Sequence, residues 1–157
     1  MKRAVVSAAI VLLAAACSSS GGGSSSSPVV AGHGAISISV EPNPVVAHQV
    51  SGDTFDIPFD VVVRETGGRA VDINRVSAEV LALGGIPVTS ESYDAAKIRS
   101  LGFSTHVNPN GELRYHFAPR RSVDERVFGN VSAELTVDGT DETGLAVTAR
   151  TNVRITK

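Results

Sequence analysis

Histidine is the residue type in this sequence best suited to bind a metal ion or to transfer a proton near neutral pH. The chain has four histidines, His33, His48, His106 and His116. No two have the i, i+4 spacing that places two ligands on one helix face, and none lies in an H-E-x-x-H motif. His116 alternates with Glu112 and Arg114, as on the solvated face of a strand. We therefore expect no metal ion, no catalytic residue and no cofactor.

Carboxylates gather at Asp138, Asp141 and Glu142, close to two glycines, and calcium is the ligand that such a group would bind. The EF-hand spacing D-x-[DN]-x-[DN]-G is absent. A solvated hairpin tip accounts for the same acids, and this is the simpler interpretation.

A local basic cluster consists of Arg120, Arg121 and Arg126. Such a cluster could contact anionic lipid headgroups or acidic glycans, since each cation contributes about 1 kcal/mol near a charged surface. Asp124 and Glu125 lie within the cluster and offset part of its charge, which favours an ordinary polar loop.

The single cysteine, Cys17, follows a positively charged start and an apolar run. This run is shorter than the roughly 20 apolar residues that cross a bilayer core, and it is typical of a secretion signal. The four residues before the cysteine resemble the lipobox of bacterial lipoproteins: Leu13, Ala14, Ala15 and Ala16. The resemblance implies that a peptidase recognises these residues and that the sulfur of Cys17 carries lipid. We expect residues 1–16 to be the signal peptide; the alternatives are an ordinary signal cut after Ala16 and a buried apolar helix.

Serine and glycine alone make up Ser18–Ser27, as in a flexible linker that has nothing to bury. We therefore expect residues 17–34 to tether a domain of residues 35–157 to a membrane through the lipid. Ser18, not aspartate, follows the cysteine. In a Gram-negative cell, the lipoprotein resemblance then implies an outer-membrane location in the cell envelope.

Five segments of the expected domain alternate apolar and polar residues with a period of two, which predicts strands with one buried face. They are Ile36–Val40, Phe55–Val63, Leu113–Phe117, Val131–Val137 and Leu145–Ile155. We expect Phe59 and Leu135 to lie in the core.

Two irregularities are expected within the strands. The apolar phase of a sixth strand, Val71–Ala82, slips between odd and even positions, which predicts a β-bulge near Asn74 and Arg75. Pro58 lacks a backbone N–H, so its strand has an edge or a bulge there. Ser92–Leu101 departs from the alternation and is expected to form a short helical turn, with Tyr93, Ala96 and Leu101 roughly on one face.

The segments from Phe55 to Gly68 and from Thr136 to Thr148 resemble a group of bacterial immunoglobulin-like domains of exported proteins. The resemblance extends over most of Ala35–Ile155. It implies an all-β fold, an antiparallel immunoglobulin-like β-sandwich of about seven strands, and no catalytic residues. Such domains usually serve as spacers or adhesive modules beside other domains, whereas we expect this one to stand alone.

The net charge of −2 gives no electrostatic reason to bind nucleic acid, and a single cysteine excludes an intramolecular disulfide. No small-molecule substrate is evident. We expect a non-catalytic binding or structural module of the cell envelope, with the membrane and an envelope protein as partners. The alternative is an enzyme or metal-binding protein whose site is assembled from distant loops, using His106, His116, Glu112 or Asp141.

Overall fold

The computed structural model describes residues 24–82, 85–124, 128 and 131–157. The expected signal peptide and lipid attachment site fall outside these ranges: Leu13, Ala14, Ala15, Ala16 and Cys17. Arg126 and the first part of the expected linker fall outside them as well. Within the described ranges, no helix is long and apolar enough to cross a membrane.

The fold is all-β, as the alternation of apolar residues predicts. The strands are β1 (Ile36–Glu41), β2 (Val45–Val46), β3 (His48–Ser51), β4 (Thr54–Asp56), β5 (Phe59–Glu65), β6 (Val71–Ala82), β7 (Ile86–Asp94), β8 (His106–Val107), β9 (Glu112–Phe117), β10 (Arg120–Ser122), β11 (Ser132–Asp141) and β12 (Ala146–Thr156). One short helix, α1 (Ala95–Ser100), follows β7.

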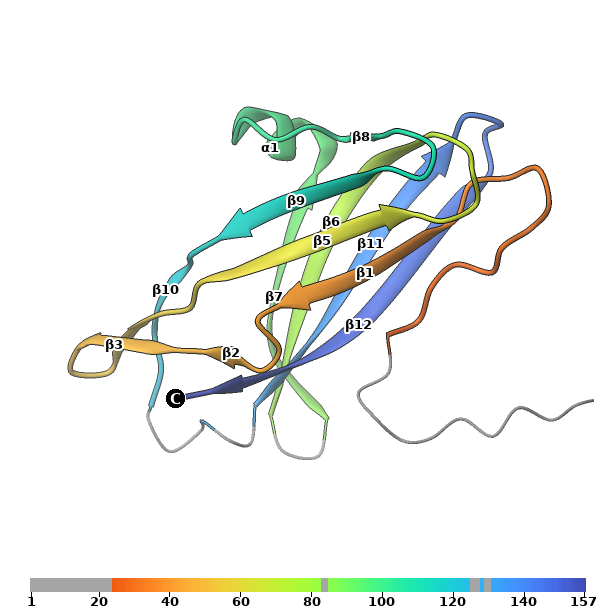
Figure 1. Cartoon of the computed structure of the whole chain (residues 1–157). Helices are drawn as coiled ribbons and strands as arrows, with labels where there is room; N and C mark the ends of the chain where they lie inside the picture. The colour runs from red at the N-terminus through yellow and green to blue at the C-terminus, as the bar shows by residue number, and fades with distance from the viewer. Residues whose placement is uncertain (1–23, 83–84, 125–127, 129–130) are drawn as a thin grey trace, which may run out of the picture.

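The strands form several sheets (Figure 1). The larger sheet has the order β2-β12-β11-β6-β7, with β8 also paired to β6. A three-stranded sheet, β1-β5-β9, lies in front of it in Figure 1, and a small sheet, β10-β4-β3, extends from one end. All neighbours are antiparallel except β2 and β12, which are parallel.

The core consists mainly of apolar side chains from the larger and the three-stranded sheet, to which β4 adds Phe55 and α1 adds Ile98. β1 and β5 contribute Ile36, Ile38 and Val61, and β11 alternates regularly between buried and half-buried residues. Leu135 on β11 is 3% exposed, which confirms it as a core residue. Phe59 is only partly buried and packs against the core from its margin, so its expected place inside the core is wrong.

The β-bulge predicted in β6 is confirmed. Gly139 pairs with Ile73 and Asp138 with Arg75, which leaves Asn74 as the extra residue. The strand expected over Phe55–Val63 is instead two strands, β4 and β5, which are separated at Pro58. Proline has no backbone N–H to donate to a neighbouring strand, so the hydrogen-bonded ladder is interrupted at Pro58.

Three details of the sequence interpretation are corrected. Leu145 was expected on the buried face of the last strand, but it is 41% exposed, because β12 begins only at Ala146. The helix begins at Ala95, and its buried residue is Ile98, whereas Tyr93 belongs to β7. The alternation did not indicate β7 itself.

Part of the expected linker lies against the domain. Ser25 and Arg150 exchange two backbone hydrogen bonds of 2.7 and 3.0 Å. The buried Ser27 donates from its backbone N–H to Ile36, and its hydroxyl donates to the carbonyl of Thr148 at 2.7 Å. This segment thereby connects β12 of the larger sheet with β1 of the other sheet.

Candidate functional site

A cavity of about 520 Å³ opens between β7 and β9, on the side of the larger sheet away from β12. We call it the inter-sheet cleft. Its apolar lining includes Val76 and Leu135 from the larger sheet and Phe117 from the three-stranded sheet. Its polar lining includes Glu91, Tyr93 and Lys97, and His116, whose side chain is largely exposed and pairs with Asp60, lies at its margin.

Phe117 is the centre of an aromatic cluster in this cleft. Its ring centroid lies 5.5 Å from that of Phe59, 5.6 Å from that of Tyr93 and 6.3 Å from that of Phe103. β9 places Phe117 directly opposite Phe59 on β5, because the two residues are register partners. Aromatic pairs at these separations are favourable, so the cluster gives the cleft a defined apolar wall.

A second cavity of about 390 Å³ adjoins the cleft. The two cavities share five lining residues: Phe59, Ala78, Glu91, Pro119 and Leu135. Most side chains around the second cavity are apolar, among them Val40, Ile57 and Val153. Apolar surface therefore continues from the cleft toward the small sheet.

Glu91 and His116 have charged partners among the described residues, whereas Lys97 has none. The Glu91 carboxylate forms an ion pair with Arg121 and accepts a hydrogen bond from the Tyr93 hydroxyl at 3.1 Å. The Nδ1 atom of His116 lies 2.7 Å from Asp60. Lys97 makes no side-chain hydrogen bond or ion pair with any described residue.

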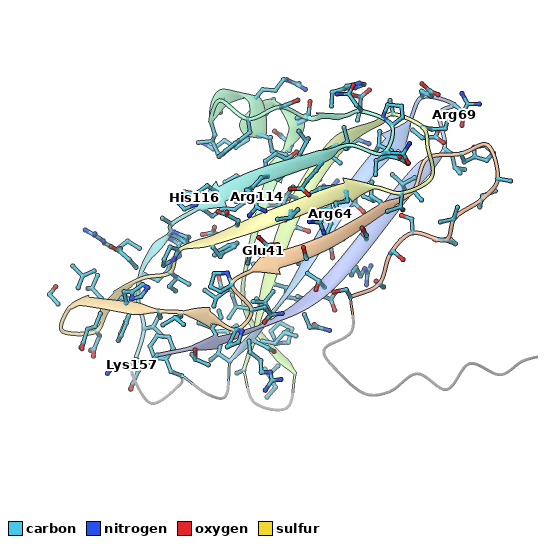
Figure 2. The ribbon with its side chains drawn as sticks, viewed as in Figure 1. Glu41, Arg64, Arg69, Arg114, His116 and Lys157 are labelled. Atoms are coloured by element: carbon cyan, nitrogen blue, oxygen red, sulfur yellow. The ribbon has the colours of Figure 1, made fainter. Side chains whose placement is uncertain are left out.

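The expected polar face of β9 is an ion-pair network on the outside of the three-stranded sheet (Figure 2). Arg114 donates to Glu41 at 2.8 Å and to Asp60 at 3.0 Å, and these hydrogen bonds raise the pKa of the guanidinium above its usual range. Hydrogen bonds from His116 and then Arg114 lower the pKa of Asp60. Apart from the half-buried Asp60 these side chains are exposed, and exposed ion pairs contribute only about 0–1 kcal/mol each.

The residues of the alternative site have different partners on different elements. His106 lies 2.8 Å from Asp72, and Asp141 lies 3.4 Å from His33, a histidine outside that set. Glu112 and His116 share one face of β9 and are separated there by Arg114. Across the described residues, no three His, Cys, Asp or Glu side chains are grouped so that they could hold a metal ion.

Asp141, one of the acids weighed for calcium, is buried at the end of β11. Its Oδ1 accepts from the backbone N–H groups of Thr143 and Leu145 and from the Thr143 hydroxyl, and its Oδ2 accepts from the N–H of Gly34. Burial alone would raise the pKa of Asp141, but these hydrogen bonds outweigh it and lower the pKa far below its usual value. The carboxylate therefore organises the turn between β11 and β12 and the chain before β1.

Glu65 has a similar role that the sequence interpretation missed. Its buried carboxylate accepts four backbone hydrogen bonds of 2.6 to 3.1 Å, whose donors are Ala35, Gly67, Gly68 and Asn110. Burial raises the pKa of Glu65, but these hydrogen bonds outweigh it and hold the pKa below its usual value. The turn residues that follow Glu65 could have indicated this role. The other two donors, Ala35 and Asn110, are distant from Glu65 in the sequence and gave no local indication.

The arginines of the predicted basic cluster are paired with acids. Arg120 donates two hydrogen bonds, of 2.7 and 2.8 Å, to Asp56, and the pKa of Asp56 is lowered chiefly by this contact. Arg121 pairs with Glu91 beside the second cavity, which both residues line. Little net positive charge is left at these two positions.

The strand β7 is an edge of the larger sheet. It has nine residues and pairs only with β6 among the described strands. Ile86 and Val88 are 64% and 63% exposed, which is unusual for apolar residues of a strand. The β7 edge and the inter-sheet cleft therefore lie side by side.

No family model matches the chain, and no curated protein matches it. The fold is similar to a solved structure described as "X-ray structure of Northeast Structural Genomics Consortium target SoR45". The TM-score is 0.56 at 12% sequence identity, and the match covers 78% of this chain and 86% of the other. At this identity the likeness concerns the fold alone.

Proposed function

We propose that this protein is a bacterial envelope lipoprotein, anchored by lipid on Cys17, whose domain is a non-catalytic module that binds an envelope protein. We further propose that the domain is an immunoglobulin-like β-sandwich. The sheet orders β1-β5-β9 and β2-β12-β11-β6-β7 and their common core support this assignment.

The β7 edge is the observation that supports binding most directly. An extended peptide can add a strand to such an edge, with its main chain hydrogen-bonded to the edge and its side chains in neighbouring pockets. Ile86 and Val88 offer apolar contacts beside the free edge. Pro87 and the extra residue Val88, which interrupts the register with β6, protect one end of the edge against uncontrolled pairing. The regular stretch Thr89–Tyr93 remains for a specific partner.

Photo-crosslinking in the native cell tests the binding surface. A photoreactive amino acid at Ser90, exposed on β7, should give a discrete crosslink to an envelope protein. The same amino acid at Ser51, exposed on β3, is the matched control and should give none.

The double variant Ile86→Lys, Val88→Lys should abolish the Ser90 crosslink, because lysines on an edge strand oppose pairing. Val50→Lys changes an exposed apolar residue of β3 and should leave the crosslink intact. Equal crosslinking from Ser90 and Ser51, or none from either, would contradict the proposal.

The anchor is tested separately by metabolic labelling with a fatty-acid analogue. Wild-type protein should be labelled and processed, and Cys17→Ala should be neither. A Cys17→Ala protein of mature size that stays in the membrane would end the lipoprotein proposal.

A further inference from the structure

We infer that the inter-sheet cleft binds a long-chain fatty acid, with the carboxylate at Lys97 and the chain along the aromatic cluster into the adjoining cavity. This inference goes beyond the proposed function and is argued from the cavities alone. Residues of β7 line both cavities, so the ligand would lie beside the edge that the protein partner would use. It rests on three features: cavity size, lining and charge.

The size and lining suit an apolar ligand. Cavities of about 300–1,000 Å³ with mostly apolar walls and a few polar groups are typical of small-molecule sites, and both cavities fall in this range. Phe59, Phe103 and Phe117 present aromatic carbon toward the space between the sheets. The lining residues shared by the two cavities connect this space with the second cavity, whose lining is more apolar.

The elongated arrangement favours a chain over a compact ligand. The first cavity extends from α1, at Lys97, to Phe59 and Pro119. The second continues from these residues to Val45 and Ile155, near the other end of the larger sheet. A flexible alkyl chain can follow both cavities, whereas a compact ring system would fill only one.

The charges favour an acid headgroup at one end. Glu91 is already neutralised by Arg121 and hydrogen-bonded by Tyr93. Asp60 is engaged by both His116 and Arg114. The ammonium of Lys97 is thus the lining charge for which the described residues provide no counter-ion, and an amphipathic anion would supply one.

Photoaffinity labelling of the full lipidated chain in lipid nanodiscs tests the inference. The probes are a diazirine-bearing C16 fatty acid and the corresponding C16 fatty alcohol, both added after purification so that the lipid on Cys17 carries no label. Peptide mapping should place the acid probe on segments of β7–α1 and β9. Labelling spread over the outer strand faces would overturn the inference.

Lys97→Glu should lower mapped labelling by the acid probe about tenfold, as expected for loss of one charge-assisted contact. Labelling by the alcohol probe should stay within twofold. Arg99→Glu makes the same charge change on the same helix, but Arg99 does not line the cleft, so acid labelling should persist. Equal labelling of Lys97→Glu and wild type by the acid would overturn the inference.

A second variant tests the apolar part. Ala78 lines both cavities, so Ala78→Phe should fill their junction and lower labelling by both probes. If this variant does not fold, the exposed Lys97→Glu substitution still decides the question. Failure of fatty-acid labelling leaves the Ser90 crosslink unaffected, so the two proposals fail independently.

Discussion

Replacing Glu65 by alanine removes the acceptor of four backbone N–H groups at once. A buried donor left without a partner costs about 1–3 kcal/mol. The N–H of Ala35 lies in a fully buried residue and should bear the full cost, whereas Gly68 and Asn110 lie at turns where water can partly replace the carboxylate. We therefore expect the free energy of unfolding to fall by about 3–5 kcal/mol.

Urea denaturation of residues 24–157, followed by circular dichroism, measures this loss. Glu112→Ala is the matched control, because this carboxylate is exposed in its ion pair with Arg64 and should change stability by less than about 1 kcal/mol. A Glu65→Ala protein within about 1 kcal/mol of wild type would refute the role assigned to the buried carboxylate.

The same prediction has a pH dependence with a definite sign. The pKa of Glu65 is lower in the folded protein than in the unfolded chain, where it is about 4.3. The stabilisation is therefore complete above about pH 4.3 and is lost as the pH falls through the folded-state pKa. The difference in stability between wild type and Glu65→Ala should narrow in acid. A difference that widens below pH 4 would contradict this reasoning.

Two further predictions concern packing. Leu135→Ala should lower the free energy of unfolding by about 2–5 kcal/mol, because Leu135 is buried. Leu145→Ala changes an exposed residue and should alter the free energy of unfolding by less than about 1 kcal/mol. Urea denaturation measures both variants, and equal losses of stability would contradict the assigned burial. A chain that begins at Ala35 should fold but melt at a lower temperature than one that begins at Ser24, because it lacks the hydrogen bonds of Ser25 and Ser27. Equal melting temperatures of the two chains would show that this segment adds no stability.

The sequence predicts best those strands that have one buried and one solvated face. Alternation located β11 and β12, and the phase slip in β6 located the bulge at Asn74. The same reasoning missed β7, because this edge strand is mostly exposed and turns Glu91 and Tyr93, not aliphatic residues, toward the cleft. A half-buried edge carries little of the alternation on which strand prediction depends.

The candidate site was less accessible to sequence reasoning for a related reason. Phe117 lies on the apolar face of a predicted strand, but Phe103 comes from the loop after α1 and Lys97 from the helix itself. Their proximity depends on how β7 and β9 approach across two sheets, which no local pattern specifies. The roles of Glu65 and Asp141 could not be predicted from local sequence for the same reason. Ala35 donates to Glu65 and Gly34 donates to Asp141, and both donors are distant from their acceptors in the sequence.

The two sides of the domain differ in a way that relates the proposed anchor to the proposed binding surfaces. On the β12 side, Ser25 and Ser27 bridge to β12 and β1, and β2 pairs with β12 as well. On the β7 side, the described strands add no neighbour to the edge, and the cleft opens there. A tether that leads from Cys17 to Ser24 would therefore join the domain at the β12 side. It would leave the β7 edge and the cleft on the side away from its attachment, accessible to an envelope partner and to a ligand.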